Sequence, residues 1–344
     1  MLTDLPKHLG HRQCNGNDVN SVAMFGFTDR QARFLVTVML HSGVFVGRQY
    51  CTFAAITHGQ KVHDFVEKLL AKRFATATTF GRQQRARIFH VQHKPLYAAI
   101  GERDNRHRKP VPVARAIERL MILDGVLADP ALNWLGTERE KRRHFIQRLG
   151  TRLGEQEYPR LVFGTPPKTT IRYFPDKLPI GVDSEGRRHV FLYLPTSVTP
   201  MDFRLFLLRH AELLHALGRW TIRVLLPATQ SYRASSFEAA AYDQLAKPLR
   251  PSELEELRWL FWQRKANASS TPDADLRRVA EVSKAFRGPR FQALYRRWLE
   301  AGDPAIWLAQ SPTFLDALNR GDGCIECLVL PHSYLHLSSL IGIA

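Results

Sequence analysis

The chain has no long hydrophobic run and no apolar segment at its start. Nowhere in its 344 residues do 18 apolar residues follow one another, as a membrane-spanning helix requires. The first residues, MLTDLPKHLGHRQ, lack the apolar core of a secretory signal peptide. We therefore expect a cytoplasmic protein that has no membrane partner.

Cysteine is scarce as well. The four cysteines are too few and too scattered to form a disulfide framework. Cys324 and Cys327 form a C-x-x-C motif, but CIECLVL has the pattern of a strand, in which residues three apart point to opposite faces. No second pair of ligands with zinc-like spacing accompanies them. We interpret both as ordinary thiols and expect neither a metal nor a cofactor.

Common enzyme signatures are missing too. The sequence contains no G-x-x-x-x-G-K-[ST], no G-x-S-x-G, no H-E-x-x-H and no dinucleotide fingerprint. These motifs supply phosphate cradles, nucleophiles and zinc ligands, so their absence favours a binding protein over an enzyme. We predict no catalytic residues.

Acidic residues are few compared with basic ones. The chain has 49 Lys and Arg against 32 Asp and Glu, a formal net charge of +17 and a pI near 10.1. Residues 1–110 hold 17 basic and 7 acidic side chains, so more than half of the surplus lies in the first third. A polyanion is the partner that such a charge attracts. The length predicts two or three domains.

The first of these domains is expected over residues 25–100, after a flexible arm at 1–24. FTDRQARFLVTVMLHSG predicts a helix that Thr28 caps and Gly43 ends. GRQYCTFAAI predicts a short second helix, and THGQKVHDFVEKLLAKR a third that Thr57 caps. FATATTFGRQQRARIFHV predicts a hairpin that turns at Gly81. This order of elements is that of a winged helix-turn-helix.

Such a domain predicts double-stranded DNA as the partner, because its recognition helix enters the major groove and its loops contact phosphates. Gln60 and Lys61 are the side chains best placed for base edges, and the arginines of the hairpin suit phosphate or the minor groove. A protein-contact role for the same domain is the alternative. The complete set of expected DNA-contacting residues is Arg48, Thr57, His58, Gln60, Lys61, Asp64, Lys68, Arg82, Gln83, Gln84, Arg85 and Arg87.

The rest of the chain predicts a connection and a larger α/β domain. Residues 101–155 hold a basic run, RDNRHRKP, expected to be a solvated linker that can follow a DNA backbone, and two helices, VARAIERLMILDGVLAD and TEREKRRHFIQRLG. In residues 156–344, TTIRYFPDKLPIGV, RRHVFLYLP and WTIRVLLP read as strands, with a helix before the third. This order predicts a mixed sheet covered by helices, followed by further helices. The fold class is therefore α+β.

At this level the chain resembles the replication-relaxation family of plasmids and conjugative elements. The matching residues are Thr28–Val91 in the first domain and Tyr173, Pro175 and Asp176 through Leu226 in the second, about two thirds of the chain. The resemblance implies a second domain similar to the PD-(D/E)XK nuclease fold. It also implies an accessory or regulatory role in the replication, transfer or recombination of a mobile genetic element such as a plasmid or transposon. The implied partners are a recombinase, a relaxase or a replication protein, and a homodimer is a further possibility.

The residues themselves argue against a working nuclease. Such a site needs two acidic groups and a lysine to hold Mg²⁺ and a water beside the scissile phosphate. Asp176 supplies the first acidic group, but no carboxylate and no lysine occurs between Glu185 and Asp202. Asp183 and Glu185 read as a hairpin tip, D-S-E-G. We therefore predict an inactive nuclease fold, with a metal-dependent nuclease of altered site as the alternative.

Overall fold

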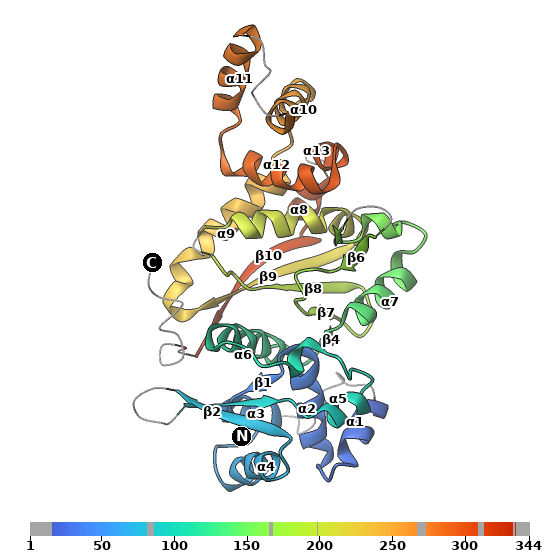
Figure 1. Ribbon diagram of the computed structural model, residues 1–344, viewed down its shortest axis with the longest axis vertical. Coiled ribbons are helices and arrows are strands. Elements are labelled where there is room, and N and C mark those ends of the chain that lie inside the picture. The colour runs from blue at the N-terminus through green and yellow to red at the C-terminus, as the bar shows by residue number, and fades with distance from the viewer. Residues whose placement is uncertain are drawn as a thin grey trace, which may run out of the picture.

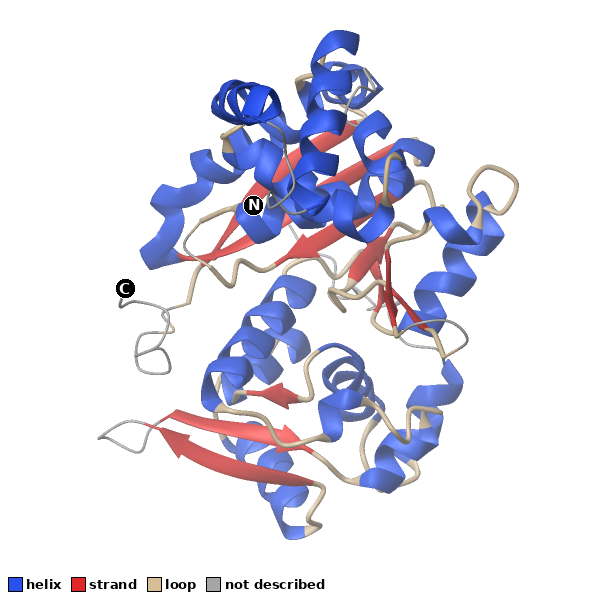
Figure 2. Cartoon of the chain, turned by 45° about the horizontal axis from the view of Figure 1, so that its top comes forward, coloured by secondary structure: helices blue, strands red, loops and turns tan. Residues whose placement is uncertain are grey.

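The computed structural model describes residues 16–80, 86–164, 168–197, 199–266, 273–308, 313–332 and 334. It is an α+β structure with a small antiparallel sheet near the amino terminus, a larger mixed sheet, and helices around both (Figures 1 and 2). No helix in these ranges is both long and apolar enough to cross a bilayer.

In the amino-terminal module, helices pack around a three-stranded sheet of order β1-β3-β2. Figure 1 shows α4 at the end of the molecule opposite α11. The elements of this module are α1 (Gly16–Ala23), α2 (Asp29–His41), β1 (Val44–Phe45), α3 (Gly47–Ala54), α4 (Gln60–Ala71), β2 (Ala75–Phe80), β3 (Ala86–Val91) and α5 (Lys94–Ala99).

The three predicted helices and the hairpin of this module are present at α2, α3, α4 and β2–β3. Thr28 caps α2 as predicted, since its Oγ1 accepts from the Gln31 amide at 3.3 Å and Gln31 returns a bond to the Thr28 amide. Gly43 follows the helix at φ +75°, a conformation that favours glycine.

An aromatic cluster holds α2, α3 and α4 together. Phe65 of α4 is fully buried, with its ring centroid 4.3 Å from that of Tyr50 and 6.0 Å from those of Phe34 and Phe45. Val62, Val66 and Leu69 continue the buried stripe of α4. The opposite face of α4 is therefore left to solvent.

A connecting region leads to the large sheet. Its elements are η1 (Arg106–Arg108), α6 (Val113–Leu127), β4 (Asn133–Leu135), α7 (Glu138–Leu149), η2 (Glu155–Glu157), β5 (Arg160–Phe163) and β6 (Thr170–Tyr173). Thr137 and Glu140 form a capping box at the start of α7. Strands β5 and β6 pair antiparallel as a separate two-stranded sheet.

The large sheet has five strands in the order β10-β9-β8-β7-β4. Strands β8, β9 and β10 are parallel, while β7 and β4 run antiparallel to their neighbours, so the predicted mixed sheet is confirmed. The connection from β8 through α8 to β9 is the expected crossover. The new elements are β7 (Ile180–Val182), β8 (Arg188–Tyr193), α8 (Met201–Ala216), β9 (Arg219–Pro227) and β10 (Gly323–Leu330).

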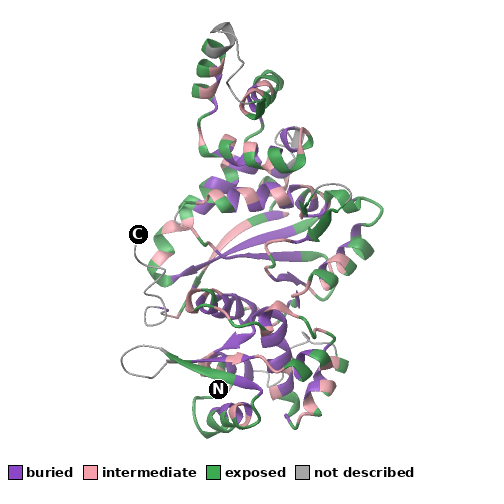
Figure 3. Ribbon diagram, in the orientation of Figure 1, coloured by how far each residue is buried: buried purple, intermediate pink, exposed green. Residues whose placement is uncertain are grey.

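Helices cover both faces of this sheet. Phe191 and Ile222 point to the face covered by α8, while Leu192 and Leu225 point to the face covered by α6. Helix α6 is buried along most of its length, because its other side packs against Val44 and Ile88 of the small sheet (Figure 3). Helix α6 thus packs against the small sheet on one side and against the large sheet on the other.

Helices α10 to α13 lie beyond α8, and α10 and α11 form the end of the molecule farthest from α4 (Figure 1). Leu257, Phe261 and Trp298 lie in the apolar core of these helices, whereas Phe237 of α9 and Phe314 of α14 belong to the core between α8 and the large sheet. The elements between β9 and β10 are η3 (Ala228–Arg233), α9 (Ala234–Ala241), the π-helical turn η4 (Tyr242–Ala246), α10 (Pro251–Ala266), α11 (Asp273–Ala285), α12 (Pro289–Ala301), α13 (Pro304–Leu308) and α14 (Thr313–Arg320).

Three expectations about the chain's organisation are wrong in the described residues. Part of the expected arm at 1–24 is helix α1, whose Val19 and Val22 are buried in the module's core; residues 1–15 lie outside the described residues. The expected linker RDNRHRKP is solvated only at its ends, residues 103–104 and 109–110, while His107 in its middle is only 3% exposed. The expected strand TTIRYFPDKLPIGV is divided between β6 and β7, because Phe174 and Lys177 take positive φ angles and turn the chain.

Candidate nucleic-acid interface

The first turn of α4 presents a row of polar side chains to solvent. His58, Gln60, Lys61, His63 and Asp64 are all exposed, on the side of α4 opposite its buried stripe. The amides of Gln60 and Lys61 precede the first backbone bonds of the helix, which Val62 and His63 donate to the Gly59 carbonyl. Together with the helix dipole, these two amides favour an anion at this end. The arrangement suits contact with a charged groove.

Gln60 and Asp64 interact with each other within this row. Gln60 Nε2 donates to Asp64 Oδ1 at 2.6 Å, which fixes the two side chains one turn apart. Lys61 has no hydrogen-bond or ion-pair partner among the described residues, so its ammonium group is available to an outside ligand. His63, which the expected set omits, is exposed between them.

Thr57 is exposed, but it does not cap α4 as predicted. The N-cap is Gly59, with an extended backbone and no side-chain cap, and the helix begins at Gln60. A threonine two residues before the N-cap is too early to reach the free amides of the first turn. The end of α4 is therefore open, with no side chain of its own on those amides.

Two other residues of the expected set have internal partners. Arg48 is bound through both guanidinium nitrogens to Asp124 of α6, each at 2.7 Å, so it is engaged inside the protein and not at the surface of α4. Lys68 donates to the carbonyl of Gly26 and lies over the ring of Phe27 at 5.3 Å. Both cations tie elements together, which their sequence positions alone do not reveal.

The hairpin contributes Arg87, which is exposed on β3 with its guanidinium 5.5 Å from the ring centroid of Phe89. Strand β2 presents Thr76, Thr78 and Thr79 to solvent. The predicted tip residues Arg82, Gln83, Gln84 and Arg85 lie outside the described residues. Of the expected set, the described surface thus retains Thr57, His58, Gln60, Lys61, Asp64 and Arg87.

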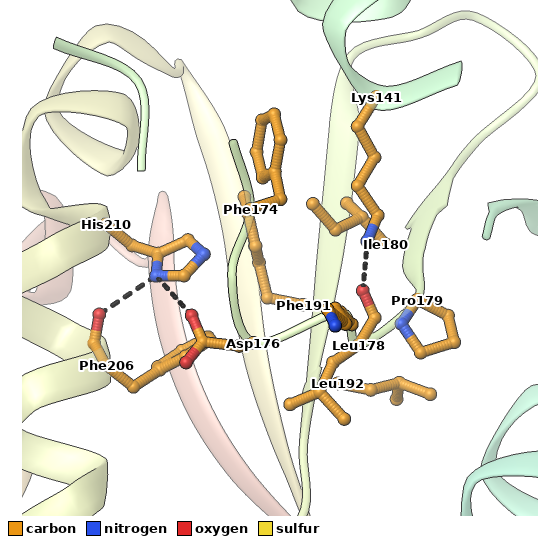
Figure 4. A pocket seen from close by; sticks show the side chains of 11 residues that line it. Lys141, Phe174, Asp176, Leu178, Pro179, Ile180, Phe191, Leu192, Phe206 and His210 are labelled. Carbon is orange, nitrogen blue, oxygen red and sulfur yellow. Dashed lines mark hydrogen bonds and ion pairs between the residues drawn. The ribbon is translucent and has the colours of Figure 1, made fainter. Parts of the chain in front are cut away.

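Asp176, the candidate first ligand of a nuclease site, lies between β6 and β7 beside α8 (Figure 4). Its Oδ1 accepts from Arg209 at 3.0 Å, and its buried Oδ2 accepts no hydrogen bond and lies 3.9 Å from His210 Nδ1. That ring nitrogen donates to the Phe206 carbonyl at 2.9 Å. Burial lowers the pKa of His210 to about 4, so the ring is neutral near pH 7.

The space beside Asp176 is small. A cavity of about 10 Å³ lies there, and Lys141 reaches its wall from α7 to donate to the Leu178 carbonyl at 2.6 Å (Figure 4). Burial lowers the pKa of Lys141 to about 7. Among the described residues no three His, Cys, Asp or Glu side chains gather where a metal ion could be held. Asp176 is therefore placed with cations and not with a second carboxylate.

Cys324 and Cys327 are free thiols on β10. Burial raises the pKa of both, and the carboxylate of Glu326 adds to the effect on each. Their interpretation as ordinary thiols agrees with this environment.

No protein-family model, no curated protein and no solved structure matches this chain.

Proposed function

We propose that this protein binds double-stranded DNA, with the first turn of α4 in the major groove and the β2–β3 hairpin against the backbone. The order α2, β1, α3, α4, β2, β3 is that expected of a winged helix-turn-helix, which supports the proposal. The observation that carries it is the exposure of Gln60 and Lys61 on a helix whose opposite face is locked into an aromatic core. A rigid helix with free polar groups at its amino end is what base reading requires.

Charge supports the same partner. The formal net charge is +17, and Lys61 has no internal acid to neutralise it among the described residues. Two acids are exposed on α4: Asp64, which accepts from Gln60 and lies one turn further along the helix, and Glu67. The backbone amides of Gln60 and Lys61, which follow the N-cap Gly59, offer additional donors to a phosphate.

The biological role follows from the resemblance to the replication-relaxation family. We propose an accessory or regulatory protein of a mobile genetic element, acting in replication, transfer or recombination without catalysis. The large sheet and its helices then serve as a scaffold for a second copy or for a recombinase, relaxase or replication protein. Helix α6, packed against both sheets, holds the DNA-reading helix in a fixed position relative to that scaffold.

The test is fluorescence anisotropy with labelled duplexes of several sequences at a series of salt concentrations. Binding should weaken steeply as salt rises, because phosphate contacts release counterions. Gln60→Ala and Lys61→Ala should each weaken the preferred duplex by roughly 5- to 150-fold and reduce the preference among sequences. Arg87→Ala should weaken all duplexes alike and lower the salt slope by about one.

The matched control is Arg250→Ala, which removes an exposed cation at the start of α10, far from α4. It should leave affinity and sequence preference unchanged. Equal losses for Arg250→Ala and Lys61→Ala would mean that only overall charge matters, and absence of binding at low salt would refute the proposal.

A further inference from the structure

A hollow of about 440 Å³ lies between α6, the loop before β7 and the start of α8. It is separate from the first turn of α4. Four cationic side chains line it, Arg106 of η1, Arg115 and Arg119 of α6, and Lys177 of the loop. The rest of the wall includes the apolar side chains of Ile122, Leu178 and Tyr193, together with three carboxylates.

Arg119 is the least expected of these side chains. It is only 9% exposed, and its buried Nη1 has no hydrogen-bond partner. A guanidinium group is always charged in a protein and offers five donors, so burying it without an acceptor is costly. Arg119 is one of the residues that line the hollow, so an acceptor that enters the hollow lies beside this side chain.

Arg106 is held on the opposite wall. Its Nη2 donates to the Lys177 carbonyl at 2.8 Å, which fixes the guanidinium between the connection and the loop. Burial, together with the positive charges of Arg119 and Arg115, lowers the pKa of Arg106 to about 10. No carboxylate counteracts these effects on Arg106.

Two of the three acidic residues around the hollow are paired. Glu118 pairs with Arg115 within the lining, and Asp176 pairs with Arg209, which does not line the hollow. Asp202 is exposed in the first turn of α8 and is the remaining carboxylate of the wall. The described lining therefore carries more positive than negative charge, with Arg106 and Arg119 inside.

The position in the sheet agrees with a ligand site. Tyr193 ends β8, and the chain then passes Leu194 and Thr196 on the wall before entering α8. In open α/β sheets small molecules bind beyond the carboxyl ends of the parallel strands. A volume of this size is typical of small-molecule pockets.

We propose that this hollow binds a phosphate-bearing ligand the size of a nucleoside monophosphate, with its phosphate group on Arg106 and Arg119. Planar guanidinium groups match phosphate oxygens in pairs, and a dianion offsets the repulsion among the arginines. The apolar wall at Ile122, Leu178 and Tyr193 receives the rest of the ligand. The phosphate comes either from a free nucleotide or from a DNA backbone, and the site does not depend on DNA reading by α4.

Thermal unfolding of the full chain tests the proposal with three probes at matched ionic strength: inorganic phosphate, adenosine monophosphate and a short duplex. Saturating adenosine monophosphate should raise the Tm by roughly 2–5 °C, because it binds only the folded state. Arg119→Gln should abolish this shift, and without ligand its Tm should equal or exceed that of the wild type, since an unpaired buried charge is removed.

Lys177→Gln provides a second variant at an exposed position, which should fold normally and lose most of the shift. Arg103→Gln is the control, because Arg103 is exposed on the same connection and does not line the hollow. It should keep the full shift. Lys61→Ala should also keep the full Tm shift. Arg119→Gln should keep the sequence preference among duplexes. Each of the two proposals can therefore be refuted without the other.

A shift with adenosine monophosphate or phosphate that needs Arg119 and Lys177 supports a free nucleotide as the source. A shift with the duplex alone that needs the same two residues supports the DNA backbone. The proposal is overturned if no probe shifts the Tm, or if Arg103→Gln loses as much as Lys177→Gln.

Discussion

The Asp124 carboxylate accepts hydrogen bonds from two distant parts of the chain. Arg48 binds both of its oxygens at 2.7 Å, Gln49 donates to Oδ1 at 2.9 Å, and the Tyr334 hydroxyl donates to Oδ2. Asp124 is 8% exposed and lies on α6, so this cluster joins α3, α6 and the segment after β10. A buried carboxylate with so many donors fixes orientation as well as charge.

Replacing Asp124 by Asn should therefore destabilise the protein by about 2–4 kcal/mol. Loss of one partner leaves the Arg48 charge half-buried and unpaired, and its partial exposure keeps the cost below that of a fully buried pair. Urea denaturation measures the change. Asp29→Asn, in an exposed pair with Arg33, is the comparison and should cost only about 0.3–0.5 kcal/mol. Equal costs would contradict a structural role for the cluster.

His41 makes stability depend on pH. Burial lowers its pKa to about 3, with a smaller contribution from Lys141, and its Nδ1 has no hydrogen-bond partner. In the unfolded chain a histidine titrates near 6.5, so below that pH the unfolded state takes a proton that the folded state refuses. Stability from this residue is complete above about pH 6.5 and is lost as the pH falls toward 3.

His41→Leu should consequently lose less stability than the wild type between pH 6.5 and pH 5. The difference should approach about 2 kcal/mol over this interval, from 1.36 kcal/mol per pH unit. Urea denaturation at the two pH values gives the comparison. His58→Leu, at an exposed histidine, should follow the wild type. If both variants change the pH dependence equally, the burial of His41 is not its cause.

At the scale of elements, a threonine before a helix contributes to stability only where it occupies the N-cap position. Thr28 caps α2 through a reciprocal pair with Gln31, whereas Thr57 is separated from α4 by the N-cap Gly59. Thr28→Ala should cost about 1 kcal/mol in unfolding free energy, and Thr57→Ala less than about 0.5 kcal/mol. Denaturation curves of both variants check this. A larger cost at Thr57 would mean that Thr57 caps α4 and that the helix begins before Gln60.

The elements that could be predicted from sequence are those with a strong local pattern. The stripe of Val62, Phe65, Val66 and Leu69 predicts α4, a continuous apolar run predicts β8, and alternation predicts the β2–β3 hairpin. The short strands β4 and β5 carry too few residues for a pattern, and they form only because partners far along the chain pair with them. Local periodicity contains no information about such partners.

In the candidate interface, too, the sequence predicts local features but not the contacts between distant residues. Exposure of Gln60 and Lys61 follows from their place on the polar side of the α4 stripe. The partners of Arg48 and Lys68 do not follow, because Asp124 lies 76 residues from Arg48 and Gly26 lies 42 residues from Lys68. The burial of Arg119 is equally hidden, since a single arginine on an apolar helix reads as a solvent-facing residue until the second sheet is in place.

At the scale of the whole molecule, α6 is the shared wall between the two sheets. Ile117 and Leu120 lie in one apolar cluster with Val44 of the small sheet and Leu192 of the large one. Gly125 faces Leu225 so closely that an added Cβ would lie 2.8 Å from its Cδ1. Because neither sheet can lose this helix without exposing its core, the two sheets should unfold together.

Hydrogen exchange tests this coupling. Leu192→Ala creates a cavity between β8 and α6 and should lower the free energy of unfolding by about 2–5 kcal/mol. It should reduce amide protection in α2 and α3 as much as in β8 and β9. Leu257→Ala is the matched control, because Leu257 is as fully buried but lies in the core of α10 and α12. It should loosen those helices and leave α2 protected. Protection of α2 that persists in Leu192→Ala would show that the small sheet unfolds on its own, and the DNA binding that we propose for α4 would then be independent of the scaffold.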